Sequence, residues 1–179
     1  MNLKITYTSI LLCISALVFG QTLPESPQGI RANFTAKSIE AYQENSQNKI
    51  REFYEYLTLY SNEKNTELKK QIRENILSLT DSDMEILDFT STVPSEIELD
   101  KFLSKIENQS FEFKIKSVQN SAETGSNDWI NSYLLWVIQD GKTSDFKLNQ
   151  TINFEPKEKQ FGSKTKTVWE MKLGDVTAD

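Results

Sequence analysis

The chain has 179 residues, 26% of them charged, with a net charge of −6 at pH 7, no histidine and a single cysteine, Cys13. Without histidine, Ser-His triads are excluded, and the usual zinc and copper sites lose their main ligands. The acidic balance disfavours nucleic acid and anionic lipid as partners, because both are bound through clustered Lys and Arg.

Residues 1–20 have the pattern of a cleavable export signal. Lys4 supplies positive charge, residues 10–19 are almost entirely apolar, and Gly20 is a small residue at the expected cut. The apolar stretch has about half the ~20 residues that a membrane-spanning helix needs. No small residue directly precedes Cys13, which argues against a lipid anchor there. We therefore predict cleavage between Gly20 and Gln21 and a periplasmic or secreted protein with no membrane span.

The first half of the processed chain is predicted to be helical. Residues 21–35 contain Pro24, Pro27 and Gly29 and are expected to form an extended linker or arm. Apolar residues then recur at steps of three and four over residues 39–60 and 67–79, which predicts two amphipathic helices. We expect one domain over residues 36–173, followed by a frayed tail at residues 174–179.

A short strand and a third helix are predicted next. Residues 84–89 are rich in apolar side chains and suit a short strand. The sequence Ser95-x-x-Glu98 matches a capping box, which predicts a helix beginning at Ser95. The apolar side of that helix carries Leu99, Phe102, Leu103 and Ile106.

The second half alternates apolar and polar residues, which is typical of strands. Strands are predicted over residues 111–116, 129–138, 146–154 and 165–173. Asp140-Gly141 indicates a tight hairpin, residues 125–128 a turn, and residues 156–162 a charged turn. Helices and strands are segregated, so the predicted class is α+β, with three N-terminal helices packed on a curved antiparallel sheet.

This order of elements resembles the nuclear transport factor 2-like superfamily, the cystatin-like cone that includes a SnoaL-like branch. The resemblance covers residues 36–173 and rests on element order and length. It implies a cone-shaped fold that hosts both enzymes and non-catalytic modules. Enzymes of this superfamily act through groups inside the cone, so carboxylate and phenol chemistry is what this histidine-free chain could offer there.

The predicted ligand-binding residues are aromatic, and each is equally well explained as core: Tyr42, Tyr54, Tyr133, Trp136 and Trp169. Asp88 and Asp128 are the carboxylates nearest the expected cone, and both are expected to be exposed. Asp81-x-Asp83-x-Glu85 resembles the start of a calcium loop, but Ile86 and Thr92 occupy the positions that need Gly and Glu. No catalytic residue, metal site or cofactor is therefore assigned.

We expect an exported, non-catalytic binding or interaction module of the bacterial envelope, binding a small apolar ligand or an envelope protein. The alternative is a small-molecule isomerase or dehydratase that uses Asp and Tyr inside the cone.

Both faces of the strand at residues 129–138 are apolar, and helices can cover only one of them. The other face is expected to be covered by a second copy, as a homodimer, or by residues 21–35 through Leu23, Ile30 and Phe34. Otherwise it remains a narrow stripe shielded by Lys114, Lys116 and Lys147.

Overall fold

In a computed structural model, residues 34–123 and 127–179 are described. The predicted export signal and its cleavage site, most of the predicted linker and part of the turn at residues 125–128 lie outside the described residues. Within the described ranges, no helix combines the length and the apolar character needed to cross a membrane.

Two of the three predicted helices lie close to where the sequence places them. Helix α3 spans Ala36–Asn62, and the Thr35 side chain caps it by accepting a hydrogen bond from the Ser38 amide at 3.2 Å. Helix α4 spans Thr66–Leu79, and the Asn65 side chain accepts from the two amides that open it. Both helices therefore begin at side chains that satisfy free backbone N–H groups.

The predicted capping box at Ser95-x-x-Glu98 is wrong. Residues Glu96–Glu98 form strand β2, which pairs with β1 (Glu85–Leu87), and helix α5 begins after them and spans Leu99–Ile106. Glu98 precedes α5 without a side-chain capping bond and instead contacts Lys101 at 2.9 Å. The strand forms because Ile86 is fully buried, and pairing with Ile97 satisfies the backbone beside it.

The second half forms a four-stranded antiparallel meander in the order β3-β4-β5-β6. The strands are β3 Phe111–Glu123, β4 Asp128–Gln139, β5 Lys142–Phe161 and β6 Lys164–Ala178. Asp140 and Gly141 both have positive φ, 51° and 73°, as the predicted tight hairpin between β4 and β5 requires. Over residues 34–123 and 127–179, the α+β class with three helices on antiparallel sheet is confirmed.

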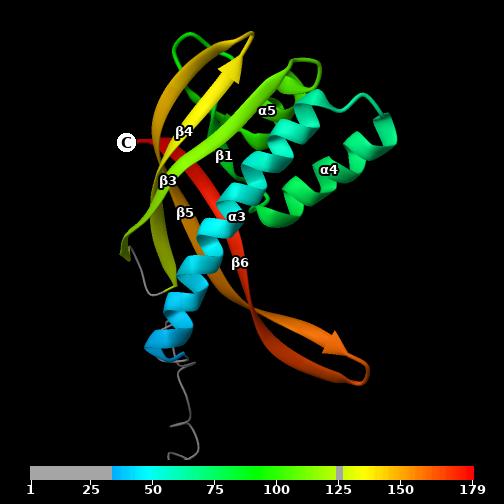
Figure 1. Ribbon diagram of the computed structural model, residues 1–179. Coiled ribbons are helices and arrows are strands. Elements are labelled where there is room, and N and C mark those ends of the chain that lie inside the picture. The colour runs from blue at the N-terminus through cyan, green and yellow to red at the C-terminus, as the bar shows by residue number, and fades with distance from the viewer. Residues whose placement is uncertain (1–33, 124–126) are drawn as a thin grey trace, which may run out of the picture.

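The last two strands are longer than predicted, and two predictions are wrong there. Residues 156–162 continue β5 instead of forming a charged turn, and the chain reverses at Gly162 and Ser163. Residues 174–178 continue β6 instead of fraying, because Val176 is fully buried and pairs with Gln150. Beyond the body of the sheet, β5 and β6 extend as a projecting hairpin with no helix against it (Figure 1).

Helix α3 lies across one face of the sheet, with α4 beside it (Figure 1). We call this face the inner face. It carries the buried residues of β4, which alternate with half-buried residues on the outer face. The inner residues of β4 are Trp129, Asn131, Tyr133, Leu135 and Val137.

Candidate functional site

The inner face contains a buried series of hydrogen-bonded polar side chains. The hydroxyls of Tyr54 on α3 and Tyr133 on β4 are 2.8 Å apart, and Tyr133 also donates to Gln150 Oε1 at 3.3 Å. Gln150 in turn donates to the Gly174 carbonyl at 3.2 Å. All three side chains are almost completely buried. These polar groups satisfy one another's hydrogen-bonding capacity, so Tyr54, Tyr133 and Gln150 form a structural part of the core.

Burial also fixes the protonation state of the two phenols. Burial raises the pKa of Tyr54 well above its ordinary value, and the hydrogen bond with Tyr133 offsets this only in part. The pKa of Tyr133 is likewise raised, first by burial and then by Tyr54. Both phenols remain neutral at physiological pH, so neither can serve as a general base there.

A second buried polar group lies farther along α3. Ser46 Oγ accepts from the indole of Trp129 at 3.1 Å and from Asn131 Nδ2 at 2.7 Å, and it donates to the Gln43 carbonyl at 2.6 Å. These bonds fasten the first half of α3 to β4. Asn131 Oδ1 is the one atom of the group without a partner among the described residues.

The predicted ligand-binding residues do not converge on one site. Tyr54 and Tyr133 meet in the core, whereas Tyr42 lies about 18 Å farther along α3, by helix geometry. There Tyr42 and Trp169 pack with Phe34 and Phe154, with ring centroids 4.6 to 5.4 Å apart. Phe34 therefore lies on the inner face, and its predicted role in covering the outer face is wrong.

The fifth predicted residue, Trp136, lies on the outer face. Its ring is half-buried, and the Lys116 ammonium lies 3.3 Å from the ring centroid. The other apolar residues of this outer stripe, Ile130, Leu134 and Ile138, are also half-buried. The predicted shielding by Lys116 is therefore present over Trp136, where it gives a cation–π contact.

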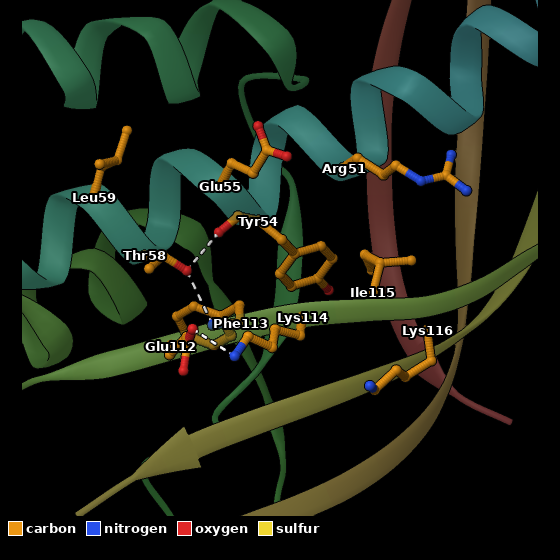
Figure 2. Close-up of a pocket in the computed structure, with 10 residues that line it drawn as sticks. All are labelled: Arg51, Tyr54, Glu55, Thr58, Leu59, Glu112, Phe113, Lys114, Ile115 and Lys116. Carbon is orange, nitrogen blue, oxygen red and sulfur yellow. Dashed lines mark hydrogen bonds and ion pairs between the residues drawn. The ribbon is translucent and has the colours of Figure 1, made fainter.

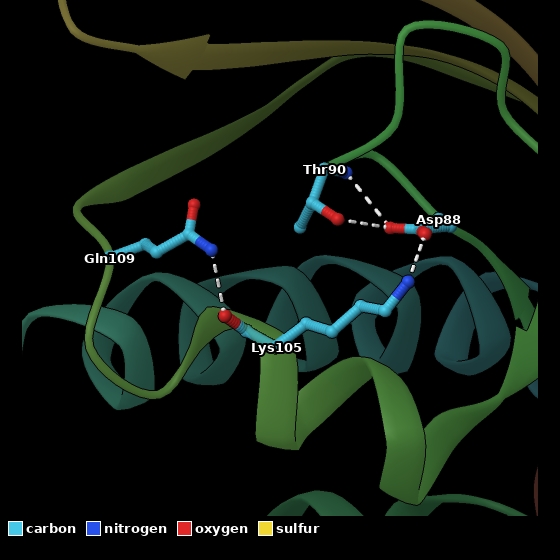
Figure 3. Close-up of polar contacts among 4 residues, drawn as sticks. All are labelled: Asp88, Thr90, Lys105 and Gln109. Atoms are coloured by element: carbon cyan, nitrogen blue, oxygen red, sulfur yellow. Dashed lines mark hydrogen bonds and ion pairs between the residues drawn. The ribbon is translucent and has the colours of Figure 1, made fainter.

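The two carboxylates considered for catalysis lie apart from the tyrosines. Asp88 is buried, contrary to expectation, and its carboxylate contacts Lys105 Nζ and Thr90 Oγ1, each at 2.5 Å, and the Thr90 amide at 3.0 Å (Figure 3). Burial acts to raise its pKa, but the hydrogen bonds from Lys105 and Thr90 outweigh it, so the pKa lies below its ordinary value. Asp128 is half-buried at the start of β4, opposite Asn153. With its pKa lowered and its oxygens held by Lys105 and Thr90, Asp88 is not poised as a general acid near neutral pH.

A groove of about 570 Å³ separates α3 from β3 (Figure 2). Its walls combine apolar side chains with charges of both signs. The α3 wall consists of Arg51, Tyr54, Glu55, Thr58 and Leu59, and the β3 wall of Glu112, Phe113, Lys114, Ile115 and Lys116. Leu59 is 53% exposed and is one of four large hydrophobic residues exposed in the described part of the chain. Glu112 and Lys114 neutralise each other at 2.7 Å.

Strand β3 is an edge of the sheet, and α3 occupies only the start of that edge. The Phe111 carbonyl accepts from Ser61 Oγ at 3.2 Å and from Asn62 Nδ2 at 2.7 Å. The Phe113 amide donates to Thr58 Oγ1 at 2.9 Å. These contacts show that alternate residues of β3 direct backbone groups away from β4, as an antiparallel ladder requires.

The next outward-directed position on β3 is Ile115, which lines the groove. Within the described residues, no hydrogen bond from α3 reaches its backbone. Beyond it, a bulge between Ile115 and Ser117 interrupts the pairing with β4. The edge is therefore open at the groove, and an open edge can accept a further strand.

The sequence contained a partial signal for this edge. Thr58, Ser61 and Asn62 are three and four residues apart and therefore lie on one side of a helix, but polar residues at this spacing do not by themselves indicate a strand as their partner. Which strand they would meet depended on how α3 crosses the sheet, and no periodicity in the sequence determines that crossing. The groove was consequently missed.

Comparison with known proteins gives no further indication of function: the sequence matches no known protein family, and no curated protein is detectably similar to it. In residues 34–123 and 127–179, no three His, Cys, Asp or Glu side chains are grouped so that they could hold a metal ion. The packed interior, the groove and the open edge of β3 are therefore the features that bear on function.

Proposed function

We propose that the protein is an exported, non-catalytic binding module of the bacterial envelope, and that it binds an extended segment of a partner protein along the edge of β3. The observation that carries this proposal is the open edge at Ile115, in a groove whose α3 wall includes the exposed Leu59. Addition of a peptide strand to such an edge supplies main-chain hydrogen bonds, and side pockets supply specificity. The charges of both signs on Arg51 and Glu55 suit a polypeptide better than a small apolar ligand.

The packing of the inner face supports a module over an enzyme. An isomerase or dehydratase of the cone type would need a cavity with a carboxylate beside a tyrosine. In the described residues the tyrosine hydroxyls bond to each other and to Gln150, while Asp88 bonds to Lys105 and Thr90. Membership of the nuclear transport factor 2-like superfamily remains a prediction from the order of elements.

Proline at position 115 tests this function. Ile115→Pro removes the outward N–H group and leaves the ladder with β4 intact, since proline is tolerated where an edge N–H faces away from the sheet. Ile115→Val keeps the N–H group and the branched side chain and serves as the matched control. When the purified protein is incubated with an envelope extract of the producing bacterium, wild type and Ile115→Val should bind a partner protein. Ile115→Pro should not bind it. Equal retention by an Ile115→Pro protein with an unchanged melting temperature would refute the proposal.

Export and assembly are separate parts of the proposal. N-terminal sequencing of the exported protein should begin at Gln21, and an intact N-terminus or a lipid on Cys13 would contradict export by cleavage. Light scattering at micromolar concentration should give a dimer if the outer face pairs with a second copy. A monomer would refute the homodimer alone, because peptide binding at β3 does not require it.

A further inference from the structure

The projecting part of the β5–β6 hairpin, residues 155–168, carries a cationic face that the register of the two strands creates. Along β5, Lys157, Lys159 and Phe161 lie on one face, and the cross-strand partners of Lys159 and Phe161 are Lys166 and Lys164. All five of these side chains are exposed. Four lysines, Phe161 and Val168 thus share one face of a two-stranded ribbon in an acidic protein, with Glu155 at the base of the same face.

The pairing on this face opposes the stability of the hairpin. Lys159 and Lys166 are directly opposite each other, and like charges in that position destabilise a sheet. Glu170, at the base, contacts Lys157 at 2.7 Å and Lys159 at 3.5 Å. Toward the tip, no carboxylate of the described residues forms an ion pair with Lys164 or Lys166. The positive charge is therefore least compensated at the outer end of the hairpin.

The tip adds an apolar group to this charge. Phe161 is 54% exposed, and the Lys166 ammonium lies 5.9 Å from its ring centroid. The turn itself consists of Gly162, with φ +64°, and Ser163, so no large side chain shields the ring from that side. An aromatic ring beside lysines matches the boundary between lipid headgroups and acyl chains, where cations meet phosphate and the ring is buried.

We propose that this hairpin docks on the anionic surface of a lipid bilayer, with the lysines on the phosphate headgroups and Phe161 inserted among them. The net charge of −6 predicts that the molecule as a whole is repelled by an anionic surface. However, screening at physiological salt limits charge interactions to about 8 Å. The lysine face of a projecting hairpin is therefore attracted to an anionic surface independently of the acidic body. A soluble polyanion would use the lysines but would gain nothing from Phe161.

Vesicle flotation of the purified full chain tests the proposal. Binding is expected to vesicles of phosphatidylcholine with phosphatidylglycerol, to fall with added salt, and to be far weaker to phosphatidylcholine alone. Since each lysine at such a surface contributes about fivefold, Lys159→Gln with Lys166→Gln should weaken binding about thirtyfold. Lys37→Gln with Lys64→Gln removes the same charge from exposed positions outside the hairpin and should leave binding unchanged.

Phe161→Ser distinguishes a bilayer from a soluble polyanion. It should weaken vesicle binding about tenfold, because burial of a phenylalanine ring contributes at least that much. It should leave any binding to soluble polyphosphate unchanged. Equal binding to both kinds of vesicle, equal loss in the two lysine double variants, or vesicle binding unaffected by Phe161→Ser would each overturn the proposal.

Discussion

Tyr54, Tyr133 and Gln150 are linked by buried hydrogen bonds, and we expect Tyr54→Phe and Tyr133→Phe to lower the free energy of unfolding by different amounts. Because Tyr133 donates to Gln150, Tyr54 must donate to Tyr133, so Tyr133 is the central member. Tyr54→Phe removes one bond and leaves the Tyr133 donor satisfied, which should cost about 1 kcal/mol of unfolding free energy. Tyr133→Phe leaves both the Tyr54 hydroxyl and Gln150 Oε1 buried without this partner, which should cost roughly 2–4 kcal/mol.

Urea denaturation of the two single variants and of the double variant measures these costs. The double variant should be no less stable than Tyr133→Phe, since it no longer buries an unpaired Tyr54 hydroxyl. The expected coupling between the two sites is therefore about 1 kcal/mol or more. Equal costs for the single variants, or a double-variant cost equal to their sum, would refute the assignment of Tyr133 as the central member.

Three further predictions concern charge, the C-terminal strand and metals. Lys105→Met should lower the free energy of unfolding by roughly 1–2 kcal/mol at pH 7, because it leaves the buried Asp88 carboxylate without its counter-ion. The pKa of Asp88 in the folded protein lies below its ordinary value, so this cost should shrink as pH falls from about 4 through that lowered pKa, and a pH-independent cost would contradict this. Val176→Ala should lower the free energy of unfolding by about 1–2 kcal/mol, whereas Thr177→Ala, at the exposed neighbouring position, should hardly change it. Equal melting temperatures of the two variants would mean that residues 174–178 fray. EDTA should leave the melting temperature unchanged, and a drop of several degrees would reveal a metal.

The buried phenols also predict how stability changes at alkaline pH. Burial holds the pKa values of Tyr54 and Tyr133 above the value of about 10 that they take in the unfolded chain. The unfolded state therefore releases protons first, and stability should fall as pH rises above about 10. The fall should be shallower in the Tyr54→Phe/Tyr133→Phe double variant. Identical slopes by thermal denaturation would show that these phenols are not shielded.

The sequence predicted those parts of the fold that depend on local periodicity. Apolar spacing located α3 and α4, and the alternation around Asp140-Gly141 located the β4–β5 hairpin. It failed where tertiary contacts overrule local signals. Ser95-x-x-Glu98 matches a capping box, but pairing with β1 makes Glu96–Glu98 a strand. Residues 174–178 lack strong alternation, but burial of Val176 holds them in β6.

The candidate sites depended even more on tertiary arrangement. Trp136 and Tyr133 are three residues apart on one strand and therefore lie on opposite faces of the sheet, so they could not share a pocket. The lysine face of the β5–β6 hairpin was hidden for a related reason. In sequence its lysines alternate with Glu158, Gln160 and threonines, and only the register of the two strands brings the lysines together.

Photo-crosslinking at the groove tests whether a partner protein binds at the edge of β3. A photoreactive residue replaces Leu59 on the groove wall or, as the control, Leu68 on α4; the two leucines are 53% and 44% exposed on neighbouring helices. After irradiation of intact producing cells, position 59 should give a discrete adduct with a partner protein and position 68 should not. The adduct should disappear when Ile115→Pro is added. No adduct at position 59, the same adduct at both positions, or an adduct that persists with Ile115→Pro would contradict binding at the edge of β3.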